Sequence, residues 1–288
     1  MTNFPQIHHD RTTIAQGACR VAASGRRRMR DNARMKLATW NVNSLSVRLP
    51  QVLQWLAAER PDLLALQETK LEDARFPVAD FAAAGYHAVY SGQKTYNGVA
   101  LLARTPPQQV LRALPGLDDP QRRFIAADVD GMRVVNLYVV NGQSVGSEKY
   151  DYKLRWLAAV HEHLRAELAR QPALLVLGDF NIAPEDRDVH DADVWRDQIL
   201  CSAPERAALQ NLLALGLDDS FRVFESAGGH YSWWDYRQGG FRRNMGLRID
   251  LILSSYALRP RLRAASIDRT PRTWERPSDH TPVLLELA

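Results

Sequence analysis

The sequence predicts an α/β fold of the α+β type: a four-layer sandwich in which two packed, mixed β-sheets are flanked by helices. Three observations predict this architecture. From residue 36 onward, short runs that suit strands alternate with amphipathic segments that suit helices. Several of the short runs are apolar throughout, as in strands that are covered on both faces. No run reaches the ~18 apolar residues of a transmembrane helix, so no membrane partner is expected.

The first half of this region predicts strands around one helix. Residues 36–43 alternate apolar and polar side chains, which is typical of a strand. Residues 49–60 place apolar side chains three and four positions apart, as on the buried face of a helix. Residues 63–67 form a continuous apolar run and predict a buried strand. Two further strands are expected at 86–91 and 98–104.

The second half predicts a hairpin followed by alternating helices and strands. Residues 123–141 suit a hairpin, because Asp130-Gly131 is a strong signal for a two-residue turn. The remaining elements that we expect are helices at 150–171 and 204–215 and strands at 173–177, 249–253 and 283–287. Residues 36–288 contain no internal repeat or linker, which predicts one domain.

The basic character of the chain belongs to its first 35 residues. Residues 1–34 hold seven arginines and two acids, a net of +5, so the rest of the chain carries −1 of the total of +4. A disordered extension, a nucleic-acid-binding arm and an Arg-rich transit peptide all fit this segment. A further interpretation is that translation starts at Met29 or Met35. We place the folded catalytic domain at 36–288 and expect deletion of 1–34 to leave folding and catalysis nearly unchanged.

Cysteine usage indicates the compartment. The chain has two cysteines, Cys19 and Cys201, which is too few for a disulfide framework in a chain of this length. We therefore expect a reduced, cytoplasmic protein.

Acidic side chains stand at or near the ends of apolar runs, where a strand gives a rigid base and a loop can carry a polar group. The strings are 66–70 (LQETK), 177–181 (LGDFN), 247–251 (LRIDL) and 277–283 (PSDHTPV). Four carboxylates and one imidazole can build a divalent-metal site. An oxygen-rich set without cysteine indicates Mg²⁺, or Mn²⁺, and not structural zinc. Hydrolysis of a phosphate ester needs these parts: a Lewis acid, an activated water and donors for the developing charge.

Each residue also has a simpler interpretation when it is taken alone. The pair Asp279-His280 fits a solvated surface turn. Asn41 fits a strand-end cap, and Tyr138 fits a strand tyrosine that faces the second sheet. Trp233 and its neighbour fit core aromatics. The shared position at strand ends is what favours one site over unrelated surface loops.

An ordered set of strings resembles the exonuclease III family, which are abasic-site endonucleases of the endonuclease/exonuclease/phosphatase superfamily. The strings are 40–45 (WNVNSL), 66–70 (LQETK), 98–102 (GVALL), 178–182 (GDFNI), 232–237 (SWWDYR), 246–250 (GLRID) and 278–280 (SDH). They occur in the family's order and span nearly all of 36–288. The strings 232–237 (SWWDYR) and 246–250 (GLRID) narrow the resemblance to the DNA-repair branch of the superfamily.

The resemblance implies roles on the metal side of the site. Glu68 matches the principal metal-ligand carboxylate, and Asp179 matches the acid that orients or deprotonates the attacking water. Asn181 matches the amide that holds the phosphate and that water. Asp279 matches an acid near the metal, and Asn41 matches an asparagine beside metal and phosphate. The resemblance also implies that His280 contacts the metal and the phosphate.

The resemblance also implies roles on the phosphate side. His280 matches the imidazole on the phosphate, and Asp250 matches the carboxylate that orients it. Tyr138 matches a tyrosine whose hydroxyl reaches the scissile phosphate. Lys70 matches a basic residue near the metal ligand, and Asn141 stands where an amide contacts the phosphate. A pocket for a flipped-out, baseless sugar is implied at Trp233, Leu247 and Ile249.

The implied activity is that of an exodeoxyribonuclease III-like DNA-repair hydrolase. It would cleave double-stranded DNA on the 5′ side of abasic sites, with Mg²⁺, and trim blocked 3′ ends as a 3′→5′ exonuclease and 3′-phosphatase. The resemblance further implies a monomer in the cytoplasm, associated with the nucleoid. Two alternatives are a superfamily phosphatase that acts on a lipid or inositol phosphate and a non-catalytic, nucleic-acid-binding homologue.

Overall fold

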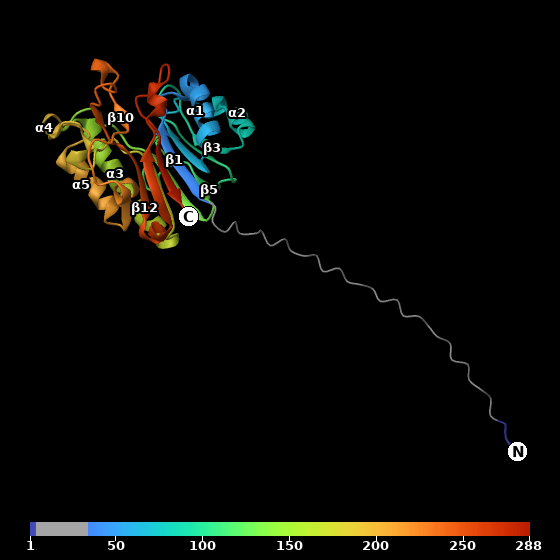
Figure 1. The fold of residues 1–288 in the computed structure, drawn as a ribbon. Coiled ribbons are helices and arrows are strands. Elements are labelled where there is room, and N and C mark those ends of the chain that lie inside the picture. Colours follow the sequence, from blue (N-terminus) through green and yellow to red (C-terminus); the bar gives the residue numbers. More distant parts are fainter. Residues whose placement is uncertain (4–33) are drawn as a thin grey trace. The chain divides into compact units, whose positions relative to one another are not determined.

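The computed structural model describes residues 1–3 and 34–288. The predicted basic extension falls almost wholly on residues 4–33 and so lies outside the described residues. Within the unit Arg34–Ala288, the strands form two six-stranded sheets and one two-stranded ribbon (Figure 1). None of the helices in this described part is long and apolar enough to cross a membrane.

The first sheet contains, in spatial order, β13 (Leu262–Ile267), β14 (Val283–Leu287), β1 (Met35–Asn41), β2 (Leu63–Gln67), β4 (Val99–Ala103) and β3 (His87–Ser91). The second contains β5 (Gln108–Leu111), β6 (Phe124–Val129), β7 (Met132–Tyr138), β8 (Leu174–Asp179), β12 (Asp250–Ser255) and β9 (Leu217–Asp219). The ribbon joins β10 (Trp233–Trp234) to β11 (Gly246–Leu247). Both sheets are mixed, because β1 pairs with β2 and β7 with β8 in parallel while their neighbours run antiparallel.

Helices cover the outer face of each sheet, which confirms the predicted four-layer sandwich (Figure 1). The helices are α1 (Leu45–Glu59), α2 (Val78–Ala83), α3 (Glu148–Arg170), α4 (Ala192–Trp195), α5 (Ala203–Leu213) and α6 (Ser220–Phe224). Helices α1 and α2 pack on the first sheet, and α3 and α5 pack on the second. Strand β8 shows how period-two alternation builds two cores. Leu175 and Leu177 face the core between the sheets, and Leu174 and Val176 face α3 and α5.

One amide joins the two sheets inside this apolar core. Asn136 of β7 is fully buried. It accepts a hydrogen bond from Nε2 of Gln67 in β2 at 2.7 Å, and it donates to the carbonyls of Leu66 and Ala100 at 2.9 Å each. A buried amide is costly to leave unpaired, so these bonds favour one alignment of β7 against β2 and β4.

The predicted hairpin is confirmed at β6 and β7. Val129 pairs with Met132 across a two-residue loop. The φ angles of Asp130 and Gly131 are 47° and 81°, as a turn with two left-handed residues requires. A second glycine, Gly178 of β8, has φ 142°, and a Cβ there would lie 1.9 Å from the carbonyl oxygen of Leu137. Only glycine therefore allows β8 to pass so close to β7.

The structure shifts the ends of several predicted elements, α1 and β8 among them, and adds several short ones. Helix α1 begins at Leu45, four residues before the predicted start, and contains Pro50. Proline has no N–H, so the carbonyl of Ser46 loses its helical hydrogen-bond partner at Pro50. Both residues are exposed to water. Strand β8 continues through Gly178 to Asp179 instead of ending before the glycine. The strands that the sequence did not predict are the short or partly exposed β5, β9, β10, β11 and β13, whose side chains have no clean alternation.

Candidate active site

The predicted site residues converge at one end of the two sheets. Asn41 ends β1 opposite Gln67, and Glu68 follows β2 directly. In the second sheet, Asp179 pairs with Tyr138 on one side and with Asp250 on the other. Parallel strands bring their carboxyl ends to the same edge of a sheet, and the antiparallel β12 contributes its first residue there. Strand pairing alone therefore brings these residues together from both sheets.

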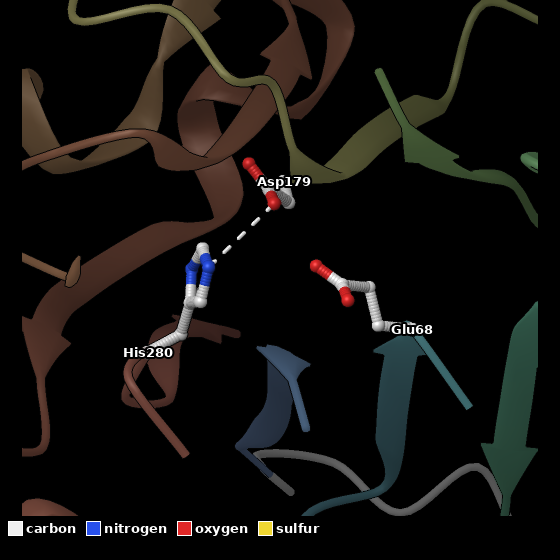
Figure 2. A group of neighbouring side chains, drawn as sticks. All are labelled: Glu68, Asp179 and His280. Carbon is white, nitrogen blue, oxygen red and sulfur yellow. Dashed lines mark ion pairs between the residues drawn. The ribbon is translucent and has the colours of Figure 1, made fainter. Parts of the chain in front are cut away.

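Glu68, Asp179 and His280 form the centre of this site (Figure 2). Each offers one ligand atom, and the three atoms lie within 4.8 Å of one another. Nε2 of His280 lies 3.8 Å from Oδ2 of Asp179. Asp179 and His280 are buried, whereas Glu68 is partly exposed. The arrangement leaves a small space that is bounded by two carboxylates and one imidazole and is open on the Glu68 side.

Asn41 holds the two carboxylates of this centre in place. Its Nδ2 donates to Oε1 of Glu68 and to Oδ2 of Asp179, at 2.9 Å each. The backbone of Asn41 is itself fixed, because its carbonyl accepts from the hydroxyl of Ser278 at 2.7 Å. Through its side chain and its backbone, Asn41 thus connects the first sheet, the second sheet and the loop that carries His280.

His280 pairs with the buried carboxylate of Asp250. Nδ1 of the ring lies 2.8 Å from Oδ2 of Asp250, which leaves Nε2 directed at the centre of the site. Burial lowers the pKa of His280, but the Asp250 and Asp179 carboxylates outweigh it and raise that pKa to about 10. The imidazole is therefore a cation over the physiological range and a donor to anionic oxygens.

The electrostatics of the two acids differ. Burial raises the pKa of Asp179, the Asp250 and Glu68 charges add to it, and the net value is about 7 despite His280. Burial also opposes ionisation of Glu68, but the ammonium of Lys70 and the amide of Asn41 outweigh it and lower the pKa of that carboxyl. Nζ of Lys70 lies 2.8 Å from Oε2 of Glu68. Glu68 is thus a fixed anion, and Asp179 can exchange a proton near neutral pH.

Two amides and a phenol line the other side of the centre. Asn181 donates from its backbone to Oδ1 of Asp179 at 2.9 Å, and Nδ2 of Asn141 donates to Oδ1 of Asn181 at 3.1 Å. Tyr138 borders the same space, and Arg123 stacks on its ring at 4.5 Å from the centroid. Burial, followed by the charge of Glu68, raises the pKa of Tyr138 well above its usual value. The phenol therefore stays protonated and can donate.

Asp279 lies beside the centre instead of within the three-residue group. Its Oδ1 accepts from Nδ2 of Asn43 at 2.9 Å, and its Oδ2 accepts from Nε1 of Trp233 at 3.0 Å. Nζ of Lys70 donates to Oδ1 of Asn43 at 2.6 Å and so links Asp279 to Glu68. The predicted contact between Asp279 and a metal stays a prediction, since both carboxylate oxygens have protein partners here.

The residues predicted to form an apolar pocket lie in one cluster. Leu247 and Ile249 are buried, and Trp233 is partly exposed against them. Trp233 pairs with Leu247 in the ribbon and forms a bridge to His280. Trp233 is thus the member of the trio that can meet a ligand without rearrangement of the cluster.

A hollow of about 770 Å³ opens next to Glu68. Three cationic side chains line it, those of Lys70, Arg123 and Lys149. Its other lining residues include the partly exposed Tyr138, the amide Asn141 and several further amides. Cations and amides around a hollow suit an extended anion with hydrogen-bonding groups.

Sequence reasoning missed several side chains that support the site. Ser232 accepts from the backbone of Asp250 at 3.0 Å, and Asn43 connects Lys70 to Asp279 as described above. Arg248 is buried and joins Asp188 at 2.6 Å and Asp219 at 2.7 Å. Asn43 and Ser232 stand inside strings that were already singled out, so their place beside a predicted ligand was an available signal. The acids that pair with Arg248 are distant in sequence and carry no such signal.

The donor set suits a divalent cation. Two carboxylate groups face a common point beside the imidazole of His280. Burial, together with the charges of Asp250 and Glu68, raises the pKa of Asp179. A hard cation at this point would stabilise the ionised carboxylates. Oxygen donors without cysteine match Mg²⁺ or Mn²⁺ better than structural zinc.

Comparison with known proteins identifies the family. Residues 38–280 match the model of the Endonuclease/Exonuclease/phosphatase family. The chain is 37% identical over 265 residues to Exodeoxyribonuclease III of Haemophilus influenzae, a match that covers 88% of this chain and 99% of that protein. The chain belongs to the exodeoxyribonuclease III branch of this family. This exodeoxyribonuclease III-like protein is therefore a hydrolase, as its sequence predicts.

Solved structures agree with this assignment. A 3′ phosphatase from Neisseria bound to a product DNA hairpin has a TM-score of 0.87 and 52% identity, covering 88% of this chain and 99% of that one. An AP endonuclease from Archaeoglobus fulgidus has a TM-score of 0.84 and 39% identity, covering 87% and 98%. The relatives of this exodeoxyribonuclease III-like chain thus carry names for different activities on one fold.

Proposed function

We propose that this chain is a Mg²⁺-dependent DNA-repair hydrolase that cleaves double-stranded DNA on the 5′ side of abasic sites. The same site would remove nucleotides and phosphates from blocked 3′ ends. The observation that supports this most is the buried centre of Glu68, Asp179 and His280, with Asp250 behind the imidazole. The catalytic domain is placed at 36–288 of the chain, acting as a cytoplasmic monomer.

Glu68 and Asp179 would hold the cation, with Asn41 fixing both carboxylates and Asn181 and Asp279 close by. Bound Mg²⁺ supplies a Lewis acid for the phosphoryl oxygens. The protein's own side chains would carry out the remaining steps.

The protein groups divide the work of phosphodiester hydrolysis. Asp179 would orient a water and accept its proton. His280, as imidazolium, donates from Nε2 to a phosphate oxygen while Asp250 holds Nδ1. Charge that develops on the phosphate oxygens would also meet the amide of Asn141, while the amide of Asn181 holds Asp179. Losing one such donor typically costs ~3 kcal/mol of transition-state stabilisation, about 10²-fold in rate.

DNA is the proposed substrate because of the surroundings of this centre. The hollow beside Glu68 is lined by Lys70, Arg123 and Lys149, which can contact successive phosphates of a backbone. Trp233 lies on the other side, over the cluster of Leu247 and Ile249, where a sugar without its base could rest. The Neisseria relative bound to product DNA supports the same substrate class.

The deciding experiment is incision of a duplex that carries a single tetrahydrofuran site. We expect a cut on its 5′ side with Mg²⁺ and none with EDTA. Asp179→Asn should lose at least about 10²-fold in rate, because the amide cannot accept the proton of water. Surface variant Asp193→Asn is the matched control and should cut normally. Turnover of inositol phosphates in place of DNA, or DNA binding without any Mg²⁺-dependent cut, would refute the proposal.

A further inference from the structure

Lys153 of α3 is a fully buried lysine directly behind the site. Its side chain and that of Glu205 in α5 are both 0% exposed. Nζ of Lys153 donates to the carbonyl of Asn181 at 2.7 Å, to the carbonyl of Asn141 at 3.2 Å and to the carboxylate of Glu205. An ammonium has three N–H groups, so these partners use all of them.

One carbonyl belongs to Asn141, which lines the hollow beside Glu68. The other belongs to Asn181, whose Nδ2 donates to Oδ2 of Asp179 at 3.3 Å and to the carbonyl of Val139 at 3.0 Å. Asn181 has a φ of 48°, a left-handed conformation that is uncommon outside glycine but that asparagine adopts more readily than most residues. Its side chain receives a hydrogen bond from Asn141. Lys153 donates hydrogen bonds to both backbones and therefore fixes the distance between the two amides.

Glu205 connects the same lysine to the apolar side of the site. Its carboxylate accepts from the backbone N–H groups of Leu200 and Ser202, at 3.1 Å each. Leu200 packs in the cluster with Leu247, against which Trp233 lies. The Lys153–Glu205 pair therefore touches the supports of both the amides and the predicted sugar pocket.

We propose that Lys153, held by Glu205, is a positioning residue that fixes the backbones of Asn141 and Asn181, so that the amide of Asn141 meets the substrate phosphate and the amide of Asn181 holds Asp179. A neutral side chain cannot provide three donors at this point. The pair contacts neither substrate nor metal in this arrangement and acts through the two asparagines. The inference rests on the proposed phosphodiesterase function of the site.

The test compares two buried ion pairs on the same helix. Lys153→Met/Glu205→Gln removes the pair behind the site without leaving one charge buried alone. The control is Arg133→Met/Glu167→Gln, which removes a pair of 2.6 Å between α3 and the end of β7 far from Tyr138. Each is assayed on the tetrahydrofuran duplex at a temperature at which circular dichroism shows a folded protein.

We expect the Lys153 double variant to lose about 10- to 100-fold in kcat with less than about a threefold change in KM, because the amides act on the transition state. The control should keep kcat within about twofold. Equal losses in kcat for both double variants, or an unchanged kcat in the Lys153 variant, would overturn the inference. Absence of incision by the wild-type protein would instead refute the proposed function.

A mutant cycle separates positioning from a general structural effect. If Lys153 acts through Asn181, the loss in kcat caused by Lys153→Met/Glu205→Gln should shrink to less than about half, on a logarithmic scale, when Asn181→Ala is already present. Fully additive losses would show that the lysine does not work through this amide, and the positioning role would be wrong.

Discussion

Replacing Asp250 by asparagine removes the carboxylate that keeps His280 protonated. Asp250 lies 2.8 Å from Nδ1 of the imidazole, and the two acids around His280 raise its pKa from 6.5 to about 10. At ~1.36 kcal/mol per pKa unit, this shift corresponds to on the order of 5 kcal/mol in favour of the imidazolium. Asp250→Asn keeps the size and one hydrogen bond but removes the charge.

The expected loss follows from the protonated fraction. At pH 8 an imidazole with a pKa of about 10 is ~99% protonated, whereas at its ordinary pKa of 6.5 it is ~3% protonated. In the variant, burial lowers the pKa of His280 while Asp179 and Asp279 still raise it. If turnover needs the imidazolium and the pKa returns to its ordinary value, kcat at pH 8 should fall about 30-fold.

The assay is kcat for incision of the tetrahydrofuran duplex between pH 5.5 and 10, together with NMR titration of the His280 ring nitrogens. Above neutral pH, the wild type should lose activity only as pH rises through about 10. Relative to the wild type, the variant should gain activity as pH falls, since its imidazole then protonates. The same sign applies to stability: the contribution from His280 is complete below pH 6.5 and is lost as pH rises through about 10.

A control variant separates this effect from general damage. Asp268 also lies near the C-terminal loop, where it accepts from Nε1 of Trp55 at 2.8 Å, but it does not contact His280. Asp268→Asn should leave the pH profile of the wild type unchanged. The reasoning fails if Asp250→Asn keeps the wild-type kcat at pH 8 and the wild-type alkaline limb.

Three further predictions concern metal, phosphate and stability. Glu68→Gln should weaken Mg²⁺ binding at least about tenfold in calorimetry, because it removes one of the few carboxylates at the centre; unchanged affinity would assign the metal elsewhere. His280→Ala should lower kcat by about 10²-fold or more while Mg²⁺ affinity stays within about threefold, and loss of the metal would show that His280 is a ligand. Arg248→Met should destabilise the protein by about 3 kcal/mol in urea unfolding, since it leaves Asp188 short of a buried partner. The exposed Arg259→Met is its control and should cost less than about 1 kcal/mol.

The fold could be predicted because its central strands are covered on both faces. The run 63–67 is buried throughout, as its composition requires, and its bounds in the structure agree with the prediction. Strand β14 is likewise found at the predicted 283–287. Strand β13 was missed because it lies at an edge of the first sheet and most of its residues are partly exposed, so its sequence lacks a clear pattern.

The site could be predicted as a set of residues but not as a network. Strand ends located Glu68, Asp179 and Asp250, because parallel and antiparallel pairing brings such ends together. The sequence predicted the helix that carries Lys153 but did not single out this lysine. It lies three residues after the buried Tyr150 and four before the buried Leu157, so its place on the apolar face was a signal of burial. The identity of its partners depends on the tertiary fold and could not be read from spacing.

The geometry of the site depends on the buried amide of Asn136 between the two sheets. Glu68 follows the strand that receives this amide, and Tyr138 stands two positions further along the strand that supplies it. If one sheet shifted relative to the other, Glu68 on the metal side would therefore move away from Tyr138 on the phosphate side while the helices were still folded. We expect Asn136→Leu to lose activity on heating several degrees below its unfolding midpoint. Loss of turnover would then report a shift of the two sheets before the protein unfolds.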